Sequence, residues 1–236
     1  MALKSWSALQ SLLLPALCLL CGAAGAGGRD LCAACANDLP HNHAACPRCA
    51  EPLPAGWSAL CARCQARAPA FDRAFVPFRY QPPLDFLIKG LKFDGRLAHA
   101  RLLGDLFATA LAERGAPWPD CILPIPLHPH RLRQRGFNQA LELARAAAHH
   151  CQIVLWPDGL RRIRDTLPQT KLRAGQRQSN VLHAFALRAP LPGARVVLFD
   201  DVVSTASTVN ECARLLRASG ATGIEVWAIA RAGDTL

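Results

Sequence analysis

The chain has 236 residues, is 51% hydrophobic and carries a formal net charge of +10. This apolar content is enough for a sizeable core and is typical of a globular protein. No apolar run approaches the length of about 18 residues that a membrane-spanning helix needs, so the sequence predicts no membrane span. The positive charge favours partners that carry phosphates, such as nucleic acid or nucleotides, or an acidic protein.

Residues 1–17 are expected to form a short leading amphipathic helix. Lys4 and the leucines that follow it also resemble the outline of a secretory signal. Pro15 interrupts that run, and no convincing cleavage site precedes Cys18. We therefore expect a cytoplasmic protein, with an export or lipoprotein signal as the alternative.

Four Cys-x-x-Cys pairs dominate residues 18–68. They are Cys18 and Cys21, Cys32 and Cys35, Cys46 and Cys49, and Cys61 and Cys64. Two intervening residues let both thiolates of a pair reach one tetrahedral ion, and two pairs complete a closed four-cysteine zinc site. We predict two structural Zn²⁺ ions, with the pairs combined in sequential order; an interleaved combination and a disulfide scaffold are the alternatives. His41 and His43 are expected to face solvent.

Residues 71–236 have the pattern of an α/β domain. Ala74 to Tyr80 is typical of an edge strand, because Pro77 cannot donate a hydrogen bond to a neighbour. The helix that follows should bury one apolar stripe, consisting of Leu84, Leu87, Ile88 and Leu91. Lys89 and Lys92 fall beside this stripe, and either solubility or contact with a phosphate would explain them.

A second apolar run, residues 121–126, predicts a buried strand that ends in a basic turn. This turn contains Arg135 and Gly136, and Asn138 can cap the alanine-rich helix that follows. Arginine suits a phosphate site because its planar guanidinium binds two oxygens at once.

Residues 161–180 are rich in cations and have poor apolar periodicity, so we expect a mobile basic loop. Loops of this length without structure of their own are often functional. The cations predicted to bind DNA are Arg161, Arg162, Arg164, Lys171, Arg173 and Arg177.

The apolar run from Val196 to Phe199 predicts a strand buried on both faces. Asp200 and Asp201 follow at its carboxyl end, where open α/β sheets bind ligands. A hydroxyl-rich loop comes next, with the residues Ser204, Thr205, Ala206, Ser207 and Thr208. A helix is expected to begin near Ser207, and the N-terminus of such a helix favours a phosphate.

These last residues resemble the signature of the type I phosphoribosyltransferases, which is an apolar strand, an acidic pair and a Thr-Thr-Gly-type loop. With the basic turn and the cysteine-rich N-terminus, the chain resembles the ComF (GntX-like) family, associated with natural competence and DNA uptake. The resemblance implies a double zinc ribbon fused to a phosphoribosyltransferase-type domain, an α/β fold with a central, mostly parallel sheet flanked by helices.

The resemblance also implies roles for the site residues. Asp200 and Asp201 would act as the catalytic carboxylates that face the ribose hydroxyls of phosphoribosyl pyrophosphate (PRPP). The loop from 204 to 208 would bind the 5′-phosphate, Arg135 and Gly136 the pyrophosphate, and Mg²⁺ would accompany PRPP. Ala206 stands where the family usually has glycine, and a positive φ there would cost about 1 kcal/mol or more.

Two functions therefore follow from the sequence. One is transfer of a phosphoribosyl group from PRPP to an unknown acceptor, for which no general base can be named. The other is a non-catalytic protein that binds single-stranded DNA or a helicase partner and keeps the fold as a ligand-binding scaffold. Aromatic residues for base stacking are few, with Phe93 and Phe137 the best placed.

Overall fold

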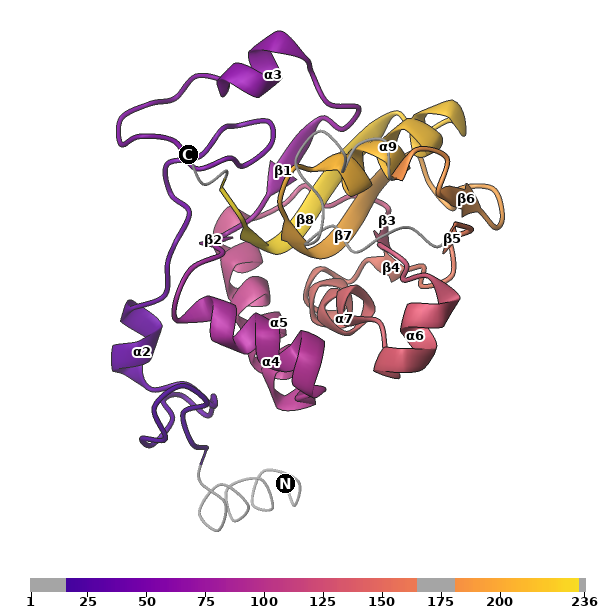
Figure 1. Ribbon diagram of the computed structural model, residues 1–236. Helices are drawn as coiled ribbons and strands as arrows, with labels where there is room; N and C mark the ends of the chain where they lie inside the picture. Colours follow the sequence, from indigo (N-terminus) through magenta and orange to yellow (C-terminus); the bar gives the residue numbers. More distant parts are fainter. Residues whose placement is uncertain (1–15, 165–180, 234–236) are drawn as a thin grey trace.

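The computed structural model describes residues 16–164 and 181–233 (Figure 1). A central sheet has the strand order β1-β8-β7-β3-β4, with β2 also paired to β8, and all of its described pairings are parallel. These strands are β1 (Arg73–Phe75), β2 (Phe78–Arg79), β3 (Cys121–Pro124), β4 (Val154–Leu155), β7 (Arg195–Val203) and β8 (Gly223–Arg231). The fold class predicted from the sequence, a mixed α/β domain with a mostly parallel sheet, is confirmed.

Helices cover both faces of this sheet (Figure 1). One face packs against α4 (Leu84–Asp94), α5 (Leu97–Arg114) and α7 (Gln139–Cys151), and the other packs against α9 (Ser207–Ala218). The segment after β3 was predicted as a basic turn, but its first part forms the short helix α6 (Pro129–Arg135), and the turn begins only at Gly136, which has a φ of 83°. Because both faces are covered, alternate residues of β3, β7 and β8 enter two separate apolar clusters.

The edge of the sheet differs in detail from the expectation. The segment predicted as one edge strand forms two short strands, β1 and β2, which both pair with β8. Between them, the carbonyl oxygens of Val76 and Pro77 accept hydrogen bonds from the side chain and backbone of Asn42, at 3.2 and 2.8 Å. The break therefore fastens the edge of the sheet to the cysteine-rich segment. The predicted apolar stripe of α4 is buried.

Strand β7 is longer than predicted. Its pairing with β8 continues from Arg195↔Gly223 to Val203↔Arg231, so Asp200 and Asp201 lie within the strand and not after it. The boundary was wrong because the sequence does not show how far the partner strand extends.

The beginning of the basic segment is also ordered differently. Arg161 and Arg162 lie in β5 (Leu160–Arg162), which forms an antiparallel pair with β6 (Phe185–Leu187). Arg162 is buried, with its guanidinium 5.5 Å from the centre of the Phe185 ring. The expectation of a mobile loop was therefore wrong for these two residues, although Arg161 is exposed. Lys171, Arg173 and Arg177 lie outside the described residues.

The cysteine-rich segment runs along the outside of the domain and contains the short helices α2 (Ala33–Asn37) and α3 (Ala62–Ala66) (Figure 1). Its first half contacts α5, where Arg29 donates a hydrogen bond to Thr109 (2.9 Å) and Arg101 pairs with Asp30. Its second half lies beside β1 and the end of β8. The predicted leading helix lies outside the described residues except for its last two. None of the helices in the described part of the chain is long and apolar enough to cross a membrane.

Candidate active site and zinc centres

Strands β3 and β7 are neighbours, and successive strands are added to the sheet in opposite directions on either side of them. From β3 the chain continues to β4 at one edge of the sheet, and from β7 it continues to β8 on the opposite side. Loops that leave the carboxyl ends of two such strands separate and leave a crevice, which is where open α/β sheets bind ligands. The basic turn after β3 and the hydroxyl-rich loop after β7 therefore open at the same edge.

Asp200 and Asp201 point to opposite faces of the sheet, as adjacent residues of a strand do. Asp201 shares its face with Phe199 and α4, and it is buried with 3% of its surface exposed. Its Oδ2 atom lies 2.5 Å from the ammonium nitrogen of Lys92. Asp200 is half-buried, and its Oδ1 atom accepts a hydrogen bond from the backbone N–H of Asp201 (2.9 Å). The two carboxylates thus have different environments, although the sequence presents them as a pair.

Electrostatics separate the two positions further. Burial and the negative charge of Asp201 raise the pKa of Asp200 well above its usual value. Burial would lower the pKa of Lys92, but the charge of Asp201 outweighs that effect, and the pKa of Lys92 is raised. Lys92 therefore stays charged, and Asp200 resists ionisation beside an existing carboxylate.

Lys92 is a site residue that the sequence left undecided. Lys89 lies on the exposed side of α4 and pairs with Asp85 one turn earlier, at 2.6 Å. Lys92 points inward because it continues the i, i+4 line of Leu84 and Ile88. That spacing is visible in the sequence and could have identified Lys92 as the inward-facing cation.

The basic turn after β3 is held by its own polar side chains. Asn138 caps α7 as predicted, accepting from the backbone N–H of Ala140 (3.1 Å), and its amide donates to the carbonyl of Ile125 (3.1 Å). Arg135 donates to Gln139 at 2.6 Å. Burial lowers the pKa of Arg135, while the charge of Asp201 acts in the opposite direction. Arg135 thus lies within electrostatic reach of the carboxylates.

The hydroxyl-rich loop ends where α9 begins at Ser207, as predicted. Ala206 has a φ of 59°, in the left-handed region, so the methyl group at this position strains the backbone. The hydroxyls of Thr205 and Ser207 lie 2.9 Å apart. No side chain caps the first turn of α9, which leaves backbone N–H groups directed at the loop. The loop has the features of a phosphate site, with a strained residue in the middle.

A cavity of about 160 Å³ separates this loop from the second half of the cysteine-rich segment. The loop contributes Thr205, Ala206 and Ser207, and α9 contributes polar groups from its first two turns. The arginines that line it come from three segments and are Arg63 and Arg67 of α3 and its C-terminal end, Arg214 of α9 and Arg231 of β8. Sequence reasoning did not assign any of these arginines to a site.

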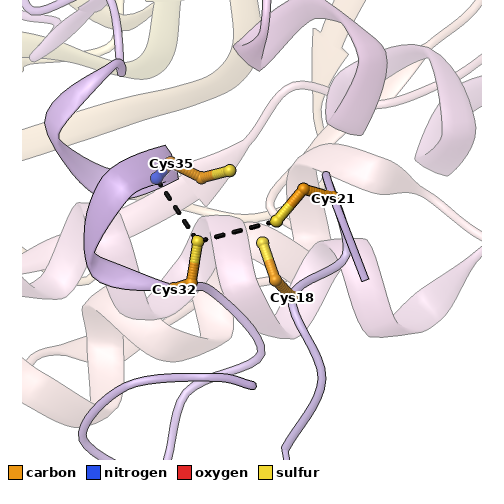
Figure 2. Close-up of side chains that lie close together, drawn as sticks. All are labelled: Cys18, Cys21, Cys32 and Cys35. Carbon is orange, nitrogen blue, oxygen red and sulfur yellow. Dashed lines mark hydrogen bonds between the residues drawn. The ribbon is translucent and has the colours of Figure 1, made fainter. Parts of the chain in front are cut away.

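The eight cysteines of the four pairs form two separate groups. Cys18, Cys21, Cys32 and Cys35 make one, and Cys46, Cys49, Cys61 and Cys64 make the other; within each group all sulfur atoms lie within 4.8 Å of one another. Figure 2 shows the first group, in which side chains from two turns of the chain point toward a common centre. The sequential combination of pairs is confirmed, and all eight cysteines are free thiols.

The protonation of these thiols favours a divalent cation. Burial opposes ionisation of Cys18 and of Cys46, yet hydrogen bonds from backbone N–H groups bring their pKa values to about 6 and about 7. Burial raises the pKa of Cys49 to about 11, and a second thiolate would also repel the first. A Zn²⁺ ion removes this conflict because it stabilises four thiolates together.

Comparisons with known proteins agree with this arrangement. A family model described as a double zinc ribbon domain matches residues 9–65. The chain is 38% identical over 226 residues to the DNA utilization protein YhgH of Salmonella typhi, with 93% of this chain and 99% of the relative covered. It is 32% identical over 209 residues to the competence protein F of Haemophilus influenzae, covering 86% and 90%. The chain belongs to the ComF family.

Among solved structures, the purine phosphoribosyltransferase of Pyrococcus horikoshii Ot3 aligns with 56% of this ComF-family chain and 81% of its own, at 15% identity and a TM-score of 0.33. The parallel sheet, its strand order and the double zinc ribbon match the fold expected from the sequence. The ComF resemblance stated from the sequence is confirmed.

The purified protein should contain two equivalents of zinc, because two groups of four thiols are preformed. Cys18→Ser should lower this to about one equivalent and disorder the first zinc site, with the remainder of the protein still folded, since a structural zinc contributes folding free energy where it binds. Metal analysis with circular dichroism provides the measurement. Fewer than one equivalent in freshly reduced wild-type protein would contradict the prediction.

Asp200→Asn should raise the melting temperature at pH 8 and raise it less at pH 5. An unfolded aspartate ionises near pH 4, whereas folding raises the pKa of Asp200. Ionisation of Asp200 at higher pH therefore destabilises the folded state, and asparagine avoids that cost.

Asp120→Asn provides the control of opposite sign. A hydrogen bond from the backbone N–H of Arg195 lowers the pKa of Asp120, so its charge contributes stability above about pH 4. This variant should melt below the wild type at both pH values. A wild-type protein that is more stable than Asp200→Asn at pH 8 would contradict the assignment.

Proposed function

We propose that this protein binds PRPP, together with Mg²⁺, in the crevice between β3 and β7 and takes part in the use of DNA by the cell. One observation carries the proposal. A cationic turn, a half-buried carboxylate and a helix N-terminus meet at the reversal point of a parallel sheet. A ligand in which a ribose joins a phosphate to a pyrophosphate matches that order of groups.

The two phosphate-binding elements would hold the two ends of the ligand. Arg135 and Gly136 would face the pyrophosphate, and the loop from 204 to 208 would take the 5′-phosphate on the N-terminus of α9. Mg²⁺, when bound, would neutralise part of the pyrophosphate charge. Of the two carboxylates, Asp200 is the one accessible to ribose hydroxyls, because Asp201 is buried on Lys92.

Asp201 and Lys92 then have a supporting role that the sequence did not suggest. The ion pair is neutral overall, so Lys92 keeps the charge of the buried Asp201 from repelling the phosphates. During transfer, the bond between the anomeric carbon and pyrophosphate would break while a bond from that carbon to the acceptor forms, and the cation of Arg135 would offset the charge on the leaving pyrophosphate. We propose binding of PRPP as the primary function, and transfer of the phosphoribosyl group to an acceptor as the step that would follow it.

Asp200→Ala should abolish binding of PRPP with Mg²⁺ while leaving inorganic pyrophosphate bound, because only the ribose contact is lost. Ala206→Gly should act in the opposite direction, since glycine adopts a φ of 59° without the strain of about 1 kcal/mol that alanine has. Its PRPP affinity should rise by up to about fivefold if the bound loop requires this φ and the free loop of the wild type can leave it. Isothermal titration of both variants against wild type gives the result, and wild-type affinity in Asp200→Ala would overturn the placement.

A second function, binding of single-stranded DNA or of a helicase partner, is favoured by the basic surface and by the names of the relatives, a DNA utilization protein and a competence protein. Arg161 and Arg164 are exposed and begin the cationic segment. Arg162 is withdrawn from this proposal because it is buried against Phe185. Phe93, with 71% of its surface exposed, offers a ring for base stacking.

Binding to a single-stranded oligonucleotide should weaken steeply as salt rises. The logarithm of the binding constant should fall linearly with the logarithm of the salt concentration, and each phosphate contact should contribute about −0.7 to that slope. Three contacts would give a slope of about −2. Replacing both Arg161 and Arg164 by alanine should make the slope shallower by about 1.4. Fluorescence anisotropy across a salt series measures this.

Arg145→Ala is the matched control, because it removes one exposed arginine from α7, away from the cationic segment. It should leave the salt slope close to the wild-type value. A wild-type slope near zero, or a double variant identical to wild type, would remove the nucleic-acid function.

A further inference from the structure

Arg231 is the last residue of β8, and only 1% of its surface is exposed. Its guanidinium makes hydrogen bonds to two segments that lie far apart in the sequence, the second zinc site and the start of the hydroxyl-rich loop. We propose that Arg231 is a positioning residue through which the second zinc site holds the phosphate loop in place. The inference rests on the proposed function, since it concerns the 5′-phosphate end of the same site.

On the zinc side, Arg231 binds the turn that carries two of the ligands. Its Nε atom donates to the backbone carbonyl of Cys49 at 3.1 Å, and its Nη2 atom pairs with the carboxylate of Glu51. The carbonyl of Glu51 in turn accepts from the backbone N–H of Cys46, at 2.8 Å. The guanidinium therefore contacts the backbone of the second zinc ligand of this site and the side chain of the residue that closes the turn.

On the loop side, Arg231 binds the residues where β7 ends. Its Nη1 atom donates to the carbonyl of Val203 at 3.0 Å and to the carbonyl of Ser204. Val203 is paired with Arg231 in the sheet, and its carbonyl also accepts from the N–H of Ala232 at 2.9 Å. Ser204 is the first residue of the loop, so this contact fixes where the loop leaves the strand.

Arginine fits this position for a chemical reason. Its planar group carries five N–H donors in a rigid arrangement, and the acceptors around it come from three directions. Lysine retains the charge that Glu51 requires but cannot reach all of the carbonyls. The charge is buried, so removing the side chain would break the pair with Glu51 and remove the hydrogen bonds to the carbonyls of Cys49 and Ser204.

The first zinc site provides an internal comparison. It has the same four-cysteine chemistry, but its segment contacts α5 through Arg29 and Asp30. Helix α5 covers the opposite face of the sheet from α9, which begins at the phosphate loop. Loss of zinc from the first site should therefore leave the loop unchanged, whereas loss from the second should release it.

The first test separates positioning from general stability by using two small ligands. Ribose 5-phosphate needs the loop, whereas inorganic pyrophosphate needs the turn at Arg135. Arg231→Lys should keep two equivalents of zinc, weaken ribose 5-phosphate at least tenfold and leave pyrophosphate within twofold of wild type. Equal weakening of both ligands, or unchanged binding of both, would overturn the inference. Glu51→Gln, a milder change, should show the same selective pattern if Arg231→Lys fails to fold.

The second test removes each zinc in turn and measures amide hydrogen exchange over residues 203–208. Cys64→Ser and Cys35→Ser are matched, because each removes the last ligand of its site. Cys64→Ser should raise exchange in the loop at least tenfold, and Cys35→Ser should leave it within twofold of wild type. Equal effects of the two variants, or no effect of Cys64→Ser, would overturn the inference. Exchange needs no ligand, so a wild-type protein that fails to bind PRPP would remove the proposed function and still leave this inference decided.

Discussion

The parallel pairing of β7 with β8 is the constraint on which the rest of the structure depends. Both strands are buried on both faces, so polar side chains that are at least partly buried lie toward the strand ends, with Glu225 near the start of β8 and the others near the carboxyl ends. Asp200, Asp201 and Arg231 all lie in these last positions. Each buried charge then needs a partner on the face where it lies. Lys92 of α4 provides one partner and Glu51 of the cysteine-rich segment provides another.

These two buried ion pairs are better understood as determinants of geometry than as sources of stability. Removing two charges from water costs about as much as their attraction returns, so a buried pair adds little net free energy. Breaking one partner away, however, leaves an uncompensated charge, and this penalty disfavours any packing in which the pair is separated. The pair of Asp201 fixes α4 against the sheet beside the crevice. The pair and hydrogen bonds of Arg231 join the second zinc site to the hydroxyl-rich loop.

How much could be predicted from the sequence depended on whether a feature is local. Cysteine spacing encodes zinc chemistry within a few residues, so both four-cysteine groups were predicted, and an unbroken apolar run such as that from Val196 to Phe199 identified the buried strand. The partner of Lys92, the burial of Arg162 and the full length of β7 depend on segments distant in the sequence. Arg231 gave no signal, because an arginine at a strand end usually faces water. The phosphate loop itself stays a prediction.

The two zinc sites illustrate why equal chemistry does not mean equal consequence. In the first, Cys21 is exposed and Cys32 and Cys35 are partly buried. All four ligands of the second are buried, and they belong to the apolar cluster that also contains residues of α9 and those side chains of β7 that face α9. Metal binding contributes its free energy to whatever folds with it. At the first site that is the apolar cluster on the α5 face of the sheet, to which Cys18 and Leu31 belong. At the second it is one side of the domain core, so the same ion there stabilises the strand ends from which the proposed phosphate loop begins.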